Sequence, residues 1–108
     1  MIEPTVRHIY SLLQSQQYDA VEKITNGIRL SAADIEEAIS EYGYRLAPYP
    51  DSVELDIVEV TGIMPREWSV VAPIFTVEEG LSDLSIELSV VENGQEIYRS
   101  ELDNIRVR

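Results

Sequence analysis

The hydrophobic pattern of this chain changes its period once, between Gly43 and Pro50. Before Gly43, apolar residues recur every three or four positions, as on the buried face of a helix. After Pro50 they alternate with polar residues, which is typical of half-buried strands. Helices followed by a run of strands joined by short turns indicate an α+β domain. The sequence therefore predicts three N-terminal helices packed on one face of a four-stranded antiparallel meander sheet.

The chain is long enough for one hydrophobic core and too short for two independent ones. We expect a single domain over residues 1–108, with a helical part at about 1–43 and a sheet part at about 52–108. The first helix is predicted by apolar residues at the i, i+3, i+4, i+7 spacing. These residues are Val6, Ile9, Tyr10 and Leu13. A second, short helix is expected from about Tyr18 to Thr25, because Asn26-Gly27 supplies a left-handed stop.

The third helix carries the clearest boundary signals. Ser31 is a natural N-cap, and Asp34 stands three positions later as a variant of the capping box. Gly43 ends the helix. Its buried face would consist of Ile35, Ala38, Ile39 and Tyr42.

The first two strands are expected to be irregular. Apolar residues alternate with acids from Val53 to Ile57, and the apolar phase then shifts, which predicts a bulge near Ile57. The stretch from Trp68 to Val77 is apolar on both faces. Pro73 interrupts this stretch and predicts an edge position or a bulge, because proline cannot donate to a sheet ladder.

The last two strands are expected to form a hairpin. Residues from Leu84 to Val90 alternate most cleanly, and Asn93-Gly94 is a strong hairpin signal. The final strand changes its apolar phase around Asp103-Asn104.

Negative charge is concentrated in the sheet part. The chain has 20 acidic and 8 basic residues, a net charge of -12. Between Pro48 and Glu96, eleven carboxylates stand against a single cation, Arg66. Such a surface repels nucleic acid and anionic membranes and attracts basic molecules. We therefore expect a basic protein partner, no nucleic acid and no membrane.

The sequence lacks the motifs of common catalytic and metal sites. It has no cysteine and one histidine, so a zinc site would depend on His8 and carboxylates. Its glycines stand singly at turns or helix ends, which excludes a phosphate-binding loop. The serines fit a helix cap or alternate with core residues. We predict no catalytic residue, no metal site and no cofactor.

The N-terminus lacks the basic and apolar regions of a secretory signal. No apolar run approaches the roughly 20 residues of a transmembrane helix. We expect a soluble cytoplasmic protein.

Two sequence patterns occur together in this chain. One runs from Trp68-Ser69-Val70 to Glu87-Leu88, and the other is the ending from Tyr98 to Val107. With Arg29-Leu30-Ser31-Ala32 and Tyr42-Gly43 upstream, the chain resembles a group of small bacterial proteins of uncharacterised function. The order of helices and curved sheet is also similar to a shortened cystatin-like roll, the shape of nuclear-transport-factor-2-like domains. Such rolls host enzymes, ligand pockets and interaction modules, so the resemblance implies a fold and no site residue.

The preferred interpretation is a non-enzymatic acidic binding protein, for example an immunity-type inhibitor that occludes a basic toxin or effector. Carboxylates of the sheet part would pair with lysine and arginine of the target, and an aromatic side chain would supply a buried anchor. The predicted partner-binding residues are Glu54, Asp56, Glu59, Trp68, Glu78, Glu79 and Asp83.

Two other functions stay open. A roll-type domain could bind or transform a small molecule in a pocket between helices and sheet. The candidate lining residues are His8, Tyr10, Tyr42, Trp68 and Tyr98. A homo-oligomer, such as a homodimer, could use the sheet as its own interface, because the stretch from Trp68 to Val77 is apolar on both faces.

Overall fold

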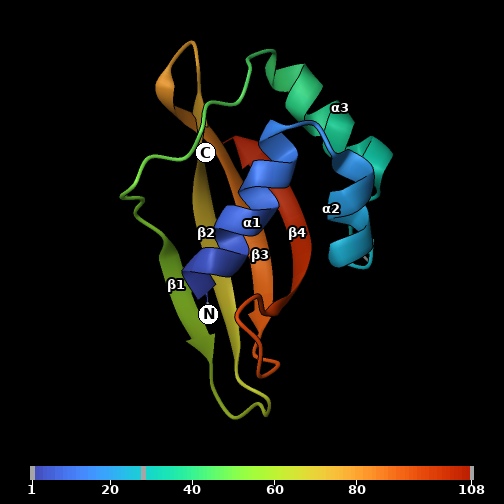
Figure 1. Cartoon of the computed structure of the whole chain (residues 1–108), viewed down its shortest axis with the longest axis vertical. Coiled ribbons are helices and arrows are strands. Elements are labelled where there is room, and N and C mark those ends of the chain that lie inside the picture. Colours follow the sequence, from blue (N-terminus) through green and yellow to red (C-terminus); the bar gives the residue numbers. More distant parts are fainter. Residues whose placement is uncertain (1, 28, 108) are drawn as a thin grey trace.

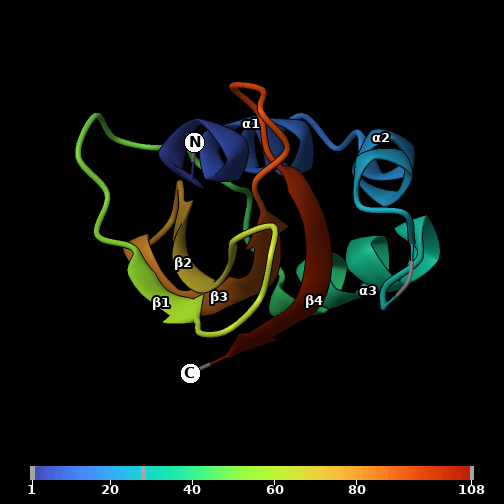
Figure 2. The same ribbon diagram turned by 90° about the horizontal axis from the view of Figure 1, so that it is seen from below.

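The computed structural model describes residues 2–27 and 29–107 and contains helices followed by strands. The elements are α1 (Ile2–Gln14), α2 (Tyr18–Ile24), α3 (Ala32–Tyr42), β1 (Asp56–Val60), β2 (Glu67–Thr76), β3 (Gly80–Val91) and β4 (Arg99–Val107). The strands form one antiparallel sheet in the order β1-β2-β3-β4. Figures 1 and 2 show α1 across the concave face of this curved sheet and α2 beside α1, and Figure 2 shows α3 below α2, next to β4. The predicted α+β arrangement is confirmed.

One face of the sheet and one face of α1 form the core. In β2 and β3, Val70 pairs with Leu88 and Ala72 with Ile86, and all four side chains are at most 1% exposed. Burial of each large apolar side chain contributes about 1.5–3 kcal/mol. The predicted buried face of α1 is confirmed, because its four residues are also at most 1% exposed. These are Val6, Ile9, Tyr10 and Leu13.

The ends of α2 and α3 follow their local sequence signals. Asn26 and Gly27, just after α2, have positive φ angles of 64° and 58°. At the start of α3, the Ser31 hydroxyl accepts a hydrogen bond from the Asp34 N–H (3.2 Å), and the Asp34 carboxylate accepts one from the Ser31 N–H (3.1 Å). Gly43 ends α3 with a φ of 86°. The capping box and both left-handed stops are confirmed.

The bulge predicted near Ile57 is wrong. β1 begins at Asp56 and pairs with β2 without interruption from Asp56 opposite Val71 to Val60 opposite Glu67. Most of β1 is exposed on both faces, and Val58 is 60% exposed. Because neither face of such a strand is buried, its apolar residues need not alternate with polar ones. The shift of the apolar residues from one face to the other therefore does not indicate a bulge.

The irregularity predicted at Pro73 is confirmed, since the register between β2 and β3 shifts between Pro73 and Phe75. β1 pairs with β2 only as far as Val71. Beyond the bulge, the neighbour of β2 is no longer β1 but the segment that precedes β1 in the chain. There the Ala47 N–H donates to the Phe75 carbonyl, and the Val77 N–H donates to the Arg45 carbonyl, both at 2.8 Å.

The last two strands pair as predicted, through a longer connection than a two-residue turn. Val91 pairs with Arg99, so residues 92–98 form the loop. Leu88 pairs with Leu102 and Glu87 with Asn104, which leaves one extra residue in β4 and accounts for the predicted phase change. None of the described helices is long and apolar enough to cross a membrane.

Replacing Ser31 by alanine removes the side-chain acceptor at the start of α3. We expect Ser31→Ala to lower the free energy of unfolding by about 1 kcal/mol. Ser40→Ala, an exposed position inside the same helix, is the matched control and should change it by less than about 0.5 kcal/mol. Urea unfolding of both variants checks this expectation. Equal losses in the two variants would contradict the capping role.

Candidate partner-binding surface

An open groove of about 550 Å³ lies between the entry to β1 and the start of β3. Strand alternation puts its floor residues Val71 and Pro73 on the face opposite to the core residues Val70 and Ala72. The groove is therefore on the side of the sheet that faces away from α1. Its lining consists of Glu54, Leu55, Asp56, Val71, Pro73, Leu81, Ser82, Asp83, Leu84 and Ser85. We call this feature the acidic groove.

Three of the predicted partner-binding residues, Glu54, Asp56 and Asp83, line the acidic groove. All three are exposed. Within residues 2–27 and 29–107, their carboxylates have no hydrogen-bond or ion-pair partner. Between them lies an apolar surface that includes Leu81, which is 66% exposed. The groove thus combines unneutralised negative charge with accessible apolar area.

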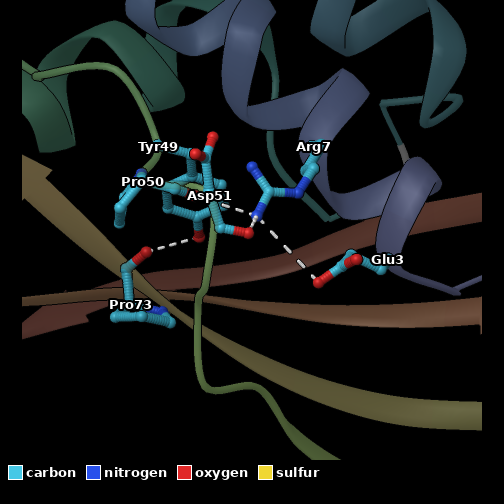
Figure 3. A network of polar contacts seen from close by, with 6 residues as sticks. All are labelled: Glu3, Arg7, Tyr49, Pro50, Asp51 and Pro73. Carbon is cyan, nitrogen blue, oxygen red and sulfur yellow. Dashed lines mark hydrogen bonds and ion pairs between the residues drawn. The ribbon is translucent and has the colours of Figure 1, made fainter.

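The wall that carries Glu54 belongs to residues 44–55, a segment that we call the strap because it crosses from α3 to β1 (Figure 1). Figure 3 shows how Arg7 of α1 holds it. The Arg7 guanidinium donates to the carbonyl oxygens of Pro50 (2.9 Å) and Asp51 (2.8 Å). It also lies 5.7 Å from the centre of the Tyr49 ring and 4.0 Å from the Glu3 carboxylate. Arg7 is not predicted from the sequence, because no local pattern links it to residues more than 40 positions away.

Two stacked tyrosines fix the strap from the inside. The Tyr10 and Tyr49 rings lie parallel with their centres 3.5 Å apart. The Tyr49 hydroxyl donates to the Pro73 carbonyl, which β1 leaves free (Figure 3). The Tyr10 hydroxyl lies within hydrogen-bond distance of the Ala47 and Phe75 carbonyls and accepts from the Phe75 N–H at 3.2 Å. These contacts connect α1, the strap and the end of β2.

Burial raises the pKa of both tyrosine hydroxyls. The pKa of Tyr10 rises from 10.0 to about 12, mainly because burial removes water from its hydroxyl and so disfavours the charged form, and the hydrogen bond with Phe75 offsets part of this rise. The pKa of Tyr49 is raised further by desolvation and by the neighbouring Tyr10. Both hydroxyls therefore stay protonated near neutral pH and keep their hydrogen bonds.

Glu78 and Glu79 have partners within the molecule. The Glu78 carboxylate accepts from the Arg45 N–H (3.0 Å) and lies 3.8 Å from its guanidinium. The Glu79 carboxylate accepts from the Tyr42 hydroxyl (2.7 Å), and this hydrogen bond is the main cause that raises the pKa of Tyr42. Glu78 therefore ties the turn between β2 and β3 to the start of the strap, and Glu79 ties it to the end of α3; a further role in partner binding stays a prediction.

Glu59 and Trp68 lie together, outside the acidic groove. The Arg66 guanidinium donates to both Glu59 oxygens, at 3.1 and 3.0 Å, and this bidentate contact lowers the pKa of Glu59. The same guanidinium lies 5.0 Å from the centre of the Trp68 ring. Trp68 is only 8% exposed and stacks on Tyr98. As an interface anchor it would need Arg66 to move, so this role also stays a prediction.

The candidate residues of the small-molecule alternative are spread over the molecule. His8 is exposed on α1, whereas Tyr10 and Trp68 are buried in the core. Trp68 and Tyr98 lie at the end of the sheet where β2 begins, and Tyr42 contacts residues at its other end. In the described part of the chain, no group of three or more histidine, aspartate or glutamate side chains could hold a metal ion.

Arg7→Ala should loosen the strap without disturbing the core. The two hydrogen bonds to strap carbonyls are exposed, so we expect the free energy of unfolding to fall by only about 1 kcal/mol. Hydrogen exchange of strap amides should accelerate in this variant. Arg99→Ala, at an exposed position of β4, is the control and should leave strap exchange unchanged. If the strap amides of Arg7→Ala exchange as slowly as those of the unmodified protein, Arg7 does not hold the strap.

Because the pKa of Tyr10 is raised, we expect the free energy of unfolding to fall at alkaline pH. Because the unfolded tyrosine ionises at about pH 10 and the folded one at about pH 12, the stability that its protonated form contributes is lost as the pH rises through this range. Tyr10→Phe cannot ionise, so the gap in unfolding free energy between it and the unmodified protein should narrow from pH 10 to 12. Urea unfolding at a series of pH values measures this gap. A constant gap would contradict the assigned pKa.

Comparison with known proteins places the chain in a family. It matches one protein family over residues 10–108, from within α1 to the end of the sheet, with all of the acidic groove included. No curated protein matches the chain, and no solved structure matches it. The family is described as a domain of unknown function. The chain therefore belongs to the DUF7668 family of domains of unknown function.

Proposed function

We propose that this protein is a non-enzymatic binding protein whose acidic groove takes a basic segment of a partner protein. The observation that carries the proposal is the groove itself, in which Glu54, Asp56 and Asp83 surround an apolar floor without neutralising partners among the described residues. Other acids of the sheet part, such as Glu59 and Glu78, are already paired with arginines.

Lysine and arginine side chains suit this groove, because each has an apolar stem and a cationic head. The stem would cover the exposed surface of Val71, Pro73 and Leu81, and the head would reach the carboxylates at the rim. The net charge of -12 would also speed the encounter with a basic protein. Both effects favour a cationic partner over a neutral one.

An immunity-type inhibitor is the concrete form of this function that we propose. A toxin or effector that acts on a negatively charged substrate has a basic substrate cleft. An acidic protein that fills this cleft blocks the substrate without chemistry of its own. We also propose that the fold is a shortened cystatin-like roll, which is supported by the curved antiparallel sheet with α1 on its concave face.

Affinity capture from a lysate of the native host, with elution by a salt gradient, tests the binding function. We expect one basic protein to elute from the immobilised, unmodified protein over a narrow range of salt concentration. The variant Glu54→Gln/Asp56→Asn/Asp83→Asn should bind that protein at least about tenfold more weakly, because three charge contacts are lost.

The matched control is Glu36→Gln/Glu37→Gln/Glu41→Gln, which removes the same charge from exposed positions on α3. It should keep nearly the full affinity. Equal weakening by both variants, or a spread of weakly held basic proteins, would mean that the acidity serves only solubility. A captured small molecule in place of a protein would favour the pocket alternative.

A further inference from the structure

β1 lies at the outer edge of the sheet, and Figures 1 and 2 show no described element beyond it. At the opposite edge, α2 and α3 pack against β4. Proteins commonly protect an edge strand by short length, proline, charged side chains or a bulge. β1 has the sequence Asp-Ile-Val-Glu-Val and pairs with β2 without a bulge, so its protection consists of its short length and two acidic side chains, which do not repel a basic strand.

The hydrogen-bond pattern of the sheet identifies the backbone groups that face this open edge. The Glu92 N–H donates to the Arg66 carbonyl, so even-numbered residues of β2 near this point face β3 and odd-numbered ones face β1. Ser69 therefore faces β1, and its partner there is Val58. Because the direction alternates along a strand, Asp56, Val58 and Val60 bond to β2, and the N–H and C=O groups of Ile57 and Glu59 point outward.

Side chains on both faces of this edge are accessible. Ile57 is 42% exposed on the α1 side of the sheet, and Val58 is 60% exposed on the other side. A strand added next to β1 could cover exposed apolar side chains of β1 on both faces of the sheet. It would also gain main-chain hydrogen bonds to Ile57 and Glu59, which is the usual source of affinity when a peptide extends a sheet.

The negative charge at β1 favours a basic strand over an acidic one as its neighbour. Asp56 lies on β1 itself and Glu54 lies just before it, and both carboxylates are without a partner among the described residues, whereas Glu59 is paired with Arg66. The residue of an added strand that lies opposite Asp56 would have its Cβ atom about 5 Å from that of Asp56. A second copy of this chain, with its own acidic β1 and a net charge of -12, would meet repulsion there. A strand with arginine or lysine would meet attraction, and from the position beside Asp56 a long side chain reaches the acidic groove.

We infer that the basic partner segment binds as an additional β-strand along β1, paired with the outward backbone groups of Ile57 and Glu59. This inference rests on the proposed function and adds the binding mode. The segment lies extended along the edge, and its basic side chains on the face away from α1 enter the acidic groove.

The test uses a short synthetic peptide in which arginine and valine alternate, titrated into the protein. On binding, amide exchange at Ile57 and Glu59 should slow, because these N–H groups gain partners. Ile57→Pro removes one outward N–H at a position where a proline leaves the bonds to β2 intact. It should bind the peptide about fivefold more weakly than Ile57→Ala, which loses the side chain and keeps the N–H.

The outcomes separate the binding mode from the function. If neutralising Glu54, Asp56 and Asp83 weakens binding while Ile57→Pro and Ile57→Ala bind equally, strand addition is wrong and the acidic groove stands. If the peptide binds and amide hydrogen exchange at Ile57 and Glu59 does not slow, strand addition is also wrong, whatever the proline variant shows. A dimer in sedimentation that Ile57→Pro dissociates would assign the edge to a second copy and overturn the inference. Failure of the lysate capture, in contrast, would count against the function itself.

Discussion

The arrangement of this molecule depends on the buried hydroxyl of Tyr10. Its ring belongs to the core face of α1, and its hydroxyl meets the backbone of Ala47 in the strap and of Phe75 in β2. A buried hydroxyl without partners would cost free energy, so these contacts allow a tyrosine to occupy a core position. They also determine where the strap crosses the end of β2. The strap, in turn, positions Glu54 at the acidic groove.

The acidic residues have two different roles in the structure. Glu59, Glu78 and Glu79 contact Arg66, Arg45 and a tyrosine hydroxyl, so they hold segments of the molecule together. The three carboxylates of the acidic groove have no such partner among the described residues. Acidic residues recur along the sheet part of the sequence except between Glu67 and Glu78, but they are not equally available to a partner, because basic residues neutralise particular acids through tertiary contacts.

Elements with local causes were predictable from the sequence. The box between Ser31 and Asp34 needs only residues three positions apart, and a proline within a strand pattern, such as Pro73, indicates an edge position or a bulge. The bulge near Ile57 was predicted wrongly, because an exposed edge strand has no buried face to set its apolar phase. The sequence predicts Trp68 as an interface anchor, yet Arg66 and the core cover it through contacts that a linear pattern does not contain.

The α+β class, the order of the elements and the excess of negative charge follow from the sequence without a structure. Hydrophobic period, capping residues and net charge are properties of neighbouring residues or of composition, so they can be read without coordinates. The folded structure is needed to see which acids gather at one groove, which edge of the sheet stays open and how Arg7 holds the strap. These features join residues far apart in the chain, and their contacts depend on packing and on strand register.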